Sequence, residues 1–228
     1  MKNSAKPSPR IKAKGSKDSI IGTWLDRFFI FAVLPLVLSN SGFSDEHRAA
    51  SLSPAAIQAA VNAASPGDTV VLPAGNYSGF NTTIEMYSQI SLRGQGVNST
   101  ILRKTSTAGQ PMFRWGNDYN DPRNKYPNDS IEISGFSLYG KGDRTTKDQG
   151  IVLHNNEYGS PNFKIHDLHL EGLGFCGIDI EGWPSYGVIY NCTFQDCFGA
   201  GLGYGVAVYT NVNNEGLPGK TAYNASLT

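Results

Sequence analysis

One short pattern of apolar residues recurs along this chain, and it limits the possible folds more than any other feature of the sequence. Residues 131–140, 163–172 and 187–196 align without gaps. The alignment superimposes apolar residues at three positions: Ile133, Ile165 and Ile189; Phe136, Leu168 and Cys192; and Leu138, Leu170 and Phe194. A second segment type recurs at residues 150–154, 177–181 and 205–209. Several short strands in each repeat are typical of a solenoid.

The spacing of the repeats favours a parallel β-helix over other solenoids. The step from Ile165 to Ile189 and the steps between the glycines at positions 150, 177 and 205 all give a period in the twenties. Leucine-rich repeats have a similar period, but their LxxLxLxxN pattern is missing here. A β-sandwich would instead show antiparallel hairpin turns. We therefore predict an all-β parallel β-helix, in which equivalent residues of neighbouring coils stack about 4.8 Å apart.

The sequence also predicts how such a stack turns and how it begins. Asp167 and Asn191 occupy the same position of successive repeats, which predicts a ladder of polar turn residues. Residues 53–67 predict one helix, with Ser53 as its N-cap and Pro54 at its first position. Its apolar residues fall on one stripe: Ile57, Ala60, Val61 and Ala64. Because an open stack of strands invites aggregation, we expect this helix to cover its N-terminal end.

The sequence of residues 1–41 predicts a targeting segment rather than part of the folded domain. Seven Lys/Arg in residues 1–27 precede an apolar run at 28–38, which is far shorter than the ~20 residues of a membrane-spanning helix. This order is typical of a secretory signal, with cleavage expected after Ser41. An uncleaved anchor stays an alternative, and it would be the only contact with a membrane. Both interpretations predict a secreted or extracytoplasmic domain over residues 42–228, and we expect further coils beyond residue 228.

Charge excludes one class of partner. Residues 28–228 hold 12 Lys/Arg and 17 Asp/Glu, a net charge of −5. A domain with this acidic balance has no general attraction for a phosphate backbone. We therefore expect no nucleic-acid partner.

Residues 55–77, AAIQAAVNAASPGDTVVLPAGNY, resemble the N-terminal entry of the pectate-lyase-like superfamily of right-handed parallel β-helices. The later coils resemble the repeat of that superfamily, so the likeness covers residues 53–209. It implies a right-handed β-helix with an N-terminal capping helix and a polysaccharide partner. The superfamily includes lyases, hydrolases, epimerases and non-catalytic surface proteins, so the fold alone does not give an activity. The NTD and GHG signatures of its known enzymes are missing from this chain.

The second segment type supplies the predicted catalytic residues. Because side chains alternate along a strand, the residues between its inward apolar positions must face outward. They form two ladders across the repeats, one of His154, Glu181 and Tyr209 and one that contains Asp179. This set could provide a base, an acid and a charge stabiliser for uronate elimination or glycoside hydrolysis. Asp179 and Glu181 are the predicted ligands of a possible calcium ion, which prefers oxygen donors. The alternative is that all four are ordinary solvated side chains.

A loop and a strand supply the predicted binding residues. The irregular stretch at 115–129 carries Trp115, Tyr119 and Tyr126, whose rings could stack on sugars. His169 and Glu171 face the same way on one strand and could bind sugar or metal. The alternatives are a solvated loop and a solvent-exposed strand, neither of which has a role in binding. An extracytoplasmic location would also allow a disulfide between Cys176 and Cys197.

These observations predict an exported β-helix protein that acts on polysaccharide, as a lyase or a glycoside hydrolase. The alternative is a non-catalytic module that binds glycan or forms part of a cell surface. The sequence leaves open whether the protein is an enzyme, and no cofactor other than calcium is expected.

Overall fold

The computed structural model describes residues 44–106, 109–116, 130–143, 145–154, 162–181, 186–198 and 203–209. The predicted signal segment, Tyr119 and Tyr126 lie outside these residues. Glu181 and Tyr209 are described by their backbone but not by their side chains. Within the described part, no helix is long and apolar enough to cross a lipid bilayer.

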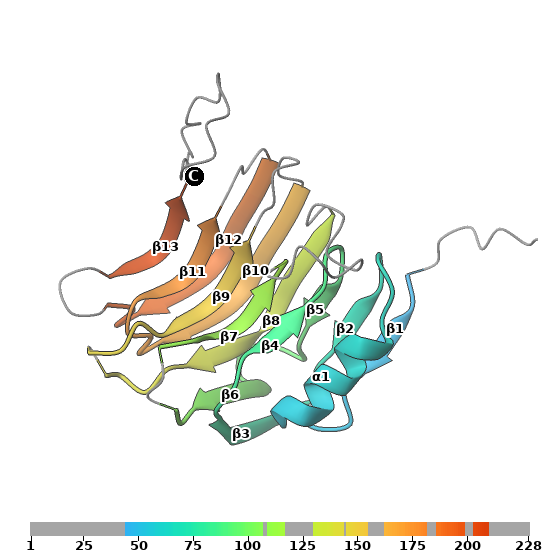
Figure 1. Cartoon of the computed structure of the whole chain (residues 1–228), viewed down its shortest axis with the longest axis horizontal. Helices are drawn as coiled ribbons and strands as arrows, with labels where there is room; N and C mark the ends of the chain where they lie inside the picture. Colours follow the sequence, from blue (N-terminus) through green and yellow to red (C-terminus); the bar gives the residue numbers. More distant parts are fainter. Residues whose placement is uncertain are drawn as a thin grey trace, which may run out of the picture. The chain divides into compact units, whose positions relative to one another are not determined.

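The described chain is mostly parallel β-sheet with one helix (Figure 1). The elements in chain order are β1 (Glu46–Arg48), α1 (Pro54–Ala63), β2 (Thr69–Val71), β3 (Gly75–Phe80), β4 (Ile84–Met86), β5 (Ser91–Arg93), β6 (Thr100–Lys104), β7 (Pro111–Trp115), β8 (Ile131–Tyr139), β9 (Gln149–His154), β10 (Asn162–Glu171), β11 (Cys176–Glu181), β12 (Tyr186–Gln195) and β13 (Tyr204–Tyr209). The all-β prediction is therefore confirmed.

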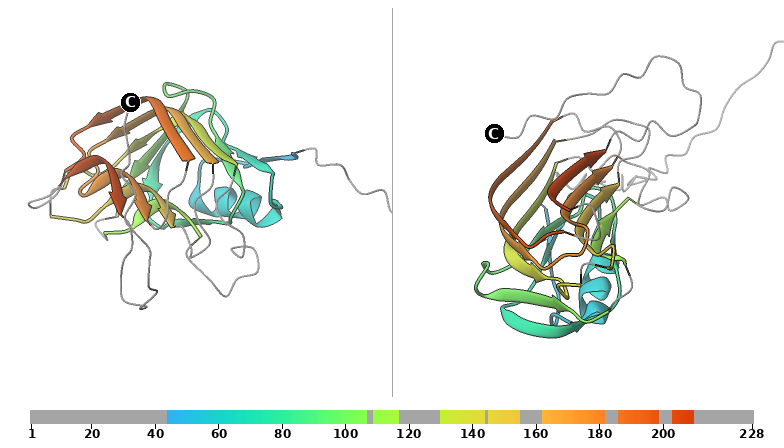
Figure 2. Two further views of the ribbon diagram at one scale, coloured as in Figure 1. Left: turned by 90° about the horizontal axis from the view of Figure 1, so that it is seen from above. Right: turned by 90° about the vertical axis from the view of Figure 1, so that its left-hand side faces the viewer.

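The strands form two sheets, and the chain alternates between them. Sheet A has eight strands. Six follow the order β1-β2-β5-β8-β10-β12, and β6 also pairs with β8 and carries β3 on its other side. Sheet B has five strands in the order β13-β11-β9-β7-β4. Each strand of sheet B follows a strand of sheet A in the chain, so each pass from β2 onward adds to both sheets, whereas β1 is followed by α1 and adds to sheet A alone. Figure 2 shows the two sheets as facing layers.

The predicted repeat register is confirmed. Ile165 pairs with Ile133 on β8 and with Ile189 on β12, and Leu168 pairs with Phe136 and Cys192. In sheet B, Ile178 of β11 likewise lies between its equivalents on β9 and β13. The parallel pairing is continuous through β8, β10 and β12, as a sequence repeat of this kind requires.

Left-handed backbone at one position bends the long strands of sheet A. Gly135, Asp167 and Asn191 are equivalent in the repeat, and their φ angles are 75°, 52° and 49°. The Asn191 side-chain amide donates a hydrogen bond to the Asp167 carboxylate. Gly, Asp and Asn tolerate this conformation better than other residues. The predicted ladder of turn residues is confirmed, and it explains why these three residue types occur there.

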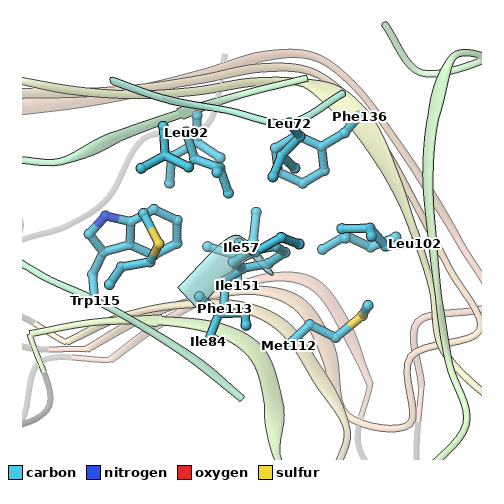
Figure 3. Packing of buried hydrophobic residues seen from close by; sticks show 14 of the residues in the cluster. Ile57, Leu72, Ile84, Leu92, Leu102, Met112, Phe113, Trp115, Phe136 and Ile151 are labelled. Atoms are coloured by element: carbon cyan, nitrogen blue, oxygen red, sulfur yellow. The ribbon is translucent and has the colours of Figure 1, made fainter. Parts of the chain in front are cut away.

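The helix α1 begins as the sequence predicts and packs against the first strands. The Ser53 side chain accepts a hydrogen bond from the backbone N–H of Ala56 at 3.3 Å. Ile57 and Val61 are fully buried, and Ile57 reaches the core between the two sheets (Figure 3). The helix contacts β1, β2 and β4, which are the strands at one end of the sheets. The short strand β1, which pairs with β2, was not predicted.

A cluster of tilted aromatic rings lies within the core. Phe113 of β7 lies 5.7 Å from Phe80, 5.9 Å from Phe136 and 6.3 Å from Trp115, measured between ring centroids. Side chains from both sheets meet around these rings (Figure 3). None of the three cysteines, all of them described, is part of a disulfide, so the structure does not contain the Cys176–Cys197 bridge that the sequence allowed. The domain is held by apolar packing between sheets.

Candidate functional site

The predicted catalytic ladder of sheet B is aligned by backbone register, but one of its members is buried. Glu181 pairs with His154 on β9 and with Tyr209 on β13, as predicted. Asp179 pairs with Val152 and Ala207, and all three residues are at most 5% exposed.

The expectation that Asp179 faces solvent is therefore wrong. Its side chain is 1% exposed and accepts a hydrogen bond from the Gln149 amide. It lies between apolar neighbours on the adjacent strands, which exclude water from the carboxylate.

The remaining members of this ladder stay predictions. His154 ends β9 and is partly exposed. The side chains of Glu181 and Tyr209 lie outside the described ones, so their distance to His154 is not defined. Among the described residues, no three His, Cys, Asp or Glu side chains gather as a metal site. The predicted calcium site needs Glu181 and is not tested by the described residues.

Trp115 does not belong to a binding loop. It ends β7, is fully buried, and donates its indole N–H to the carbonyl of Ile90 at 2.9 Å. A ring with no exposed face cannot stack on a sugar, so this prediction is wrong for Trp115. The alternation of β7 explains the difference, since Phe113 and Trp115 share the inward face.

His169 and Glu171 lie beside a groove on the outer face of sheet A, which we name the Tyr139 groove. Its volume is about 350 Å³. It is lined by Arg103, Tyr139, Gly140, Lys141, Gly142, Glu171, Gly172, Asp196 and Phe198. Strand register explains the arrangement, because Arg103 of β6, Tyr139 of β8 and Glu171 of β10 are neighbours on consecutive strands.

Direct contacts fix the polar side chains at the groove. The guanidinium carbon of Arg103 lies 3.9 Å from the centroid of the Tyr139 ring. The His169 ring lies 5.4 Å from the same ring, and His169 Nε2 is 2.9 Å from Glu171 Oε2. The His169 and Glu171 side chains are 21% and 34% exposed. A partly desolvated cation–π contact is worth about 1 kcal/mol, enough to restrict where the guanidinium points.

Glycine forms the floor of the groove, because two backbones approach each other closely there. A Cβ atom added to Gly140 would lie 2.2 Å from the carbonyl oxygen of Gly172. The Gly140 N–H donates to the carbonyl of Glu171 at 2.7 Å, and the Gly142 N–H donates to the carbonyl of Gly172 at 2.8 Å. These bonds hold the backbone on which Glu171 is mounted.

The groove combines cationic, anionic and aromatic side chains, which are group types that can bind a sugar chain. Arg103 and Lys141 are cations, Glu171 and Asp196 are carboxylates, and Tyr139 and Phe198 supply aromatic surface. Carboxylates accept hydrogen bonds from sugar hydroxyls, and guanidinium binds anionic substituents in a bidentate way. Two carboxylates are also the minimum set for glycoside hydrolysis.

The sequence pattern placed His169 and Glu171 on one outward face but did not point to Arg103, Lys141, Asp196 or Phe198. One signal could have found Arg103. Residues 100–104 continue the repeat, because Leu102 pairs with Leu138 and Arg103 pairs with Tyr139. Extending the alignment to this earlier strand would have placed a cation beside the outward Tyr139.

Comparison of the sequence with protein-family models and with curated proteins found no match.

Proposed function

We propose that this chain is an exported right-handed parallel β-helix of the pectate-lyase-like kind, and that it acts on polysaccharide in the Tyr139 groove. Support for the fold comes from the in-register parallel pairing of successive passes and from the resemblance of residues 55–77. Export is supported by the order of segments in residues 1–41, where a basic stretch precedes a short apolar run.

The observation that carries the functional proposal is the groove itself. A long polymer can lie along the outer face of a sheet, because the surface there continues from strand to strand. The Tyr139 groove crosses strands β6, β8 and β10 and brings cations, carboxylates and aromatic rings together. Neither Tyr119, Tyr126 nor the sheet B ladder is needed for this assignment.

Glu171 is the best candidate for proton transfer. It is half-buried, it lines the groove, and its carboxylate is held by His169 at 2.9 Å. A carboxylate fixed in this way can exchange a proton with a glycosidic oxygen or with a sugar carbon next to a carboxyl group. Arg103 would stabilise negative charge that develops on the substrate.

The burial of Asp179 and Trp115 favours one second candidate, a glycan-binding module without turnover. Two residues predicted to work on substrate are instead enclosed by protein. The groove would then recognise glycan without breaking it. Its contacts are the same in both cases, so the two functions differ only in whether product appears.

The test measures product and binding on the same protein. We expect the full chain, incubated with pectate, alginate and glycosaminoglycans with and without calcium, to release unsaturated uronate products or reducing ends. Glu171→Gln should remove turnover, and Arg103→Gln should weaken glycan binding. Glu132→Gln changes a carboxylate on the same sheet at a site away from the groove, so it should change neither.

Binding without turnover would support the non-catalytic module. Turnover and binding that survive both groove variants would overturn the assignment of the site.

A further inference from the structure

Two apolar side chains on the outer face of sheet A are more exposed than any other large apolar side chain described. Val188 and Tyr190 of β12 are 53% and 51% exposed. They lie two positions apart on the strand, so they point to the same side of the sheet. Both precede the turn residue Asn191, whereas the residues of β8 and β10 that line the Tyr139 groove follow the turn residues of those strands. The pair therefore forms a surface apart from the groove, which we name the Tyr190 platform.

Contacts with β10 and β8 hold the Tyr190 ring in place. It stacks on the His166 ring at 4.7 Å between centroids, with an interplanar angle of 10°. His166 is itself held at both ring nitrogens, since Nδ1 lies 2.7 Å from Asp167 Oδ2 and Nε2 lies 3.3 Å from Glu132 Oε1. Rotation of the imidazole would break at least one of these contacts. A ring that is fixed before binding loses little conformational entropy when a ligand stacks on it.

The stack with His166 uses one face of the Tyr190 ring. Parallel rings cover each other on one face only, so the exposed surface of Tyr190 lies on its opposite face and its edge. Val188 lies about 7 Å away along the strand, because each residue advances the chain by about 3.3 Å. Together the two side chains offer a narrow apolar strip of about the size of one sugar ring.

Hydrogen-bonding groups border the apolar strip. Asn191 follows Tyr190 and is exposed; its amide donates to Asp167, and its side-chain oxygen can accept a hydrogen bond from a hydroxyl group. Lys164 is exposed and pairs with Val188 in the strand register, so its ammonium can donate to a sugar oxygen. An apolar strip with a few donors and acceptors at its border matches a sugar ring, which has an apolar C–H face and hydroxyl groups at its edge.

The charges around the platform favour a neutral sugar. Glu132 and Asp167 carry negative charge on the His166 side, and Lys164 carries positive charge on the Val188 side. The border therefore has no excess of cations that would attract an anionic ligand. The Tyr139 groove differs in this respect, because two cations, Arg103 and Lys141, line it.

We propose that the Tyr190 platform is a second glycan site, at which a neutral sugar ring stacks on Tyr190 and Val188. This site goes beyond the activity assigned to the Tyr139 groove and does not depend on it. A protein partner fits the platform poorly, because two side chains supply far less than the ~800 Å² that each partner buries in a stable interface.

The two sites together would favour a long polymer. Strand β10 contributes to both, with His166 under the platform and Glu171 in the groove, so the distance between the sites is fixed. A polymer with neutral and acidic stretches that spans this distance would bind more tightly than either stretch alone.

Calorimetric titration of the full chain with neutral oligosaccharides tests the platform. The probes are hexasaccharides of β-1,4-linked glucose, mannose and galactose, and we expect at least one of them to bind. Tyr190→Ala should raise its dissociation constant about tenfold, the change that corresponds to ~1.4 kcal/mol. Tyr190→Phe keeps the ring and should bind like the parent chain. Tyr204→Ala is the matched control, since it removes a 37% exposed tyrosine from sheet B, and it should leave binding unchanged.

Two further variants separate the platform from the groove and from effects on folding. Arg103→Gln removes a cation of the groove and should leave the binding of neutral hexasaccharides unchanged. Val188→Asp places a charge on the apolar strip without altering the stacked rings, so it should weaken binding as Tyr190→Ala does. Circular dichroism shows whether each variant stays folded.

Three results would overturn the proposal. The first is that none of these hexasaccharides binds, and the second is that Tyr190→Ala and Tyr204→Ala have equal dissociation constants. The third is a loss of neutral binding in Arg103→Gln, which would assign neutral sugars to the groove. Sedimentation that shows a dimer of the parent chain and a monomer of Tyr190→Ala would overturn it as well, because the platform would then be a contact between two copies of the chain.

Discussion

A buried ion pair between β6 and the segment before β9 allows one prediction to be worked through from the structure. Lys104 Nζ lies 2.6 Å from Asp148 Oδ1, and the two side chains are only 3% and 1% exposed. Lys104 also donates to the carbonyl of Gln110. Asp148 Oδ2 is buried, and no described residue makes a hydrogen bond with it.

The attraction between these charges is large, but burial offsets most of it. At an effective dielectric constant near 20, two unit charges this close attract by about 6 kcal/mol. Removing each ion from water costs several kcal/mol, so the net contribution of the intact pair is near zero. The cost appears when one partner is removed, because the other charge stays buried.

We predict that Lys104→Met lowers the free energy of unfolding by about 3–5 kcal/mol. This is a large share of the ~5–15 kcal/mol typical of a domain. The double variant Lys104→Met/Asp148→Leu removes both charges and should recover most of that loss. Arg48→Met is the matched control, since its pair with Glu46 is exposed and should contribute at most about 1 kcal/mol.

Urea unfolding followed by circular dichroism measures all four proteins. A cost of Lys104→Met no larger than that of Arg48→Met would show that burial of the pair has no energetic consequence. A double variant as unstable as the single one would also refute the explanation, because an unpaired buried charge would then not be the cause.

Two other predictions concern a close backbone contact and a shifted carboxyl. A Cβ on Gly94 would lie 2.1 Å from the carbonyl oxygen of Gly135, so Gly94→Ala should cost about 3 kcal/mol or more in urea unfolding. A Cβ on Gly142 would meet no atom within 4 Å, so Gly142→Ala should cost only the ~1–2 kcal/mol of left-handed backbone at φ +70°. If both glycine variants lose the same free energy of unfolding, the close contact at Gly94 is not the cause. Burial raises the pKa of Asp68, but hydrogen bonds from the backbone N–H groups of Ser65 and Asp45 and from His47 outweigh it and leave the pKa lowered. Because the pKa of Asp68 is lower in the folded chain than in the unfolded chain, its ionised carboxylate stabilises the fold above about pH 4. This stabilisation is lost as the pH falls through the pKa of the folded state. Asp68→Asn should therefore have a lower free energy of unfolding than the parent chain near pH 7, and the difference between the two should shrink below about pH 4. A difference that stays the same at all pH values would contradict this explanation.

The sequence predicted the register of the sheets because each strand has one apolar face. Ile133, Ile165 and Ile189 can share a buried ladder in only one alignment, and a shift by one residue would turn them to the outside. The turn ladder was predictable for a similar reason, since few residues accept the backbone found at Asp167 and Asn191. Strand β1 was missed because so short a strand carries too little pattern to stand out.

The site was harder to predict because exposure does not follow from alternation alone. Asp179 faces away from the core between the sheets, yet it is buried beside Val152 and Ala207. The polar residues that follow Trp115 in the sequence indicate a loop, although Trp115 itself completes the inward face of β7. The Tyr139 groove needs Arg103, which comes from a strand outside the aligned repeats.

Locating glycan on the protein surface tests the proposed groove without relying on turnover. Nuclear magnetic resonance of the isotope-labelled chain, titrated with uronate and neutral oligosaccharides, reports which backbone amides sense the sugar. Binding in the Tyr139 groove predicts that the largest shifts fall on Gly140, Gly142 and Gly172 and are lost in Arg103→Gln. Shifts that gather on β9 and β11 around His154, or no shifts with any oligosaccharide, would contradict it.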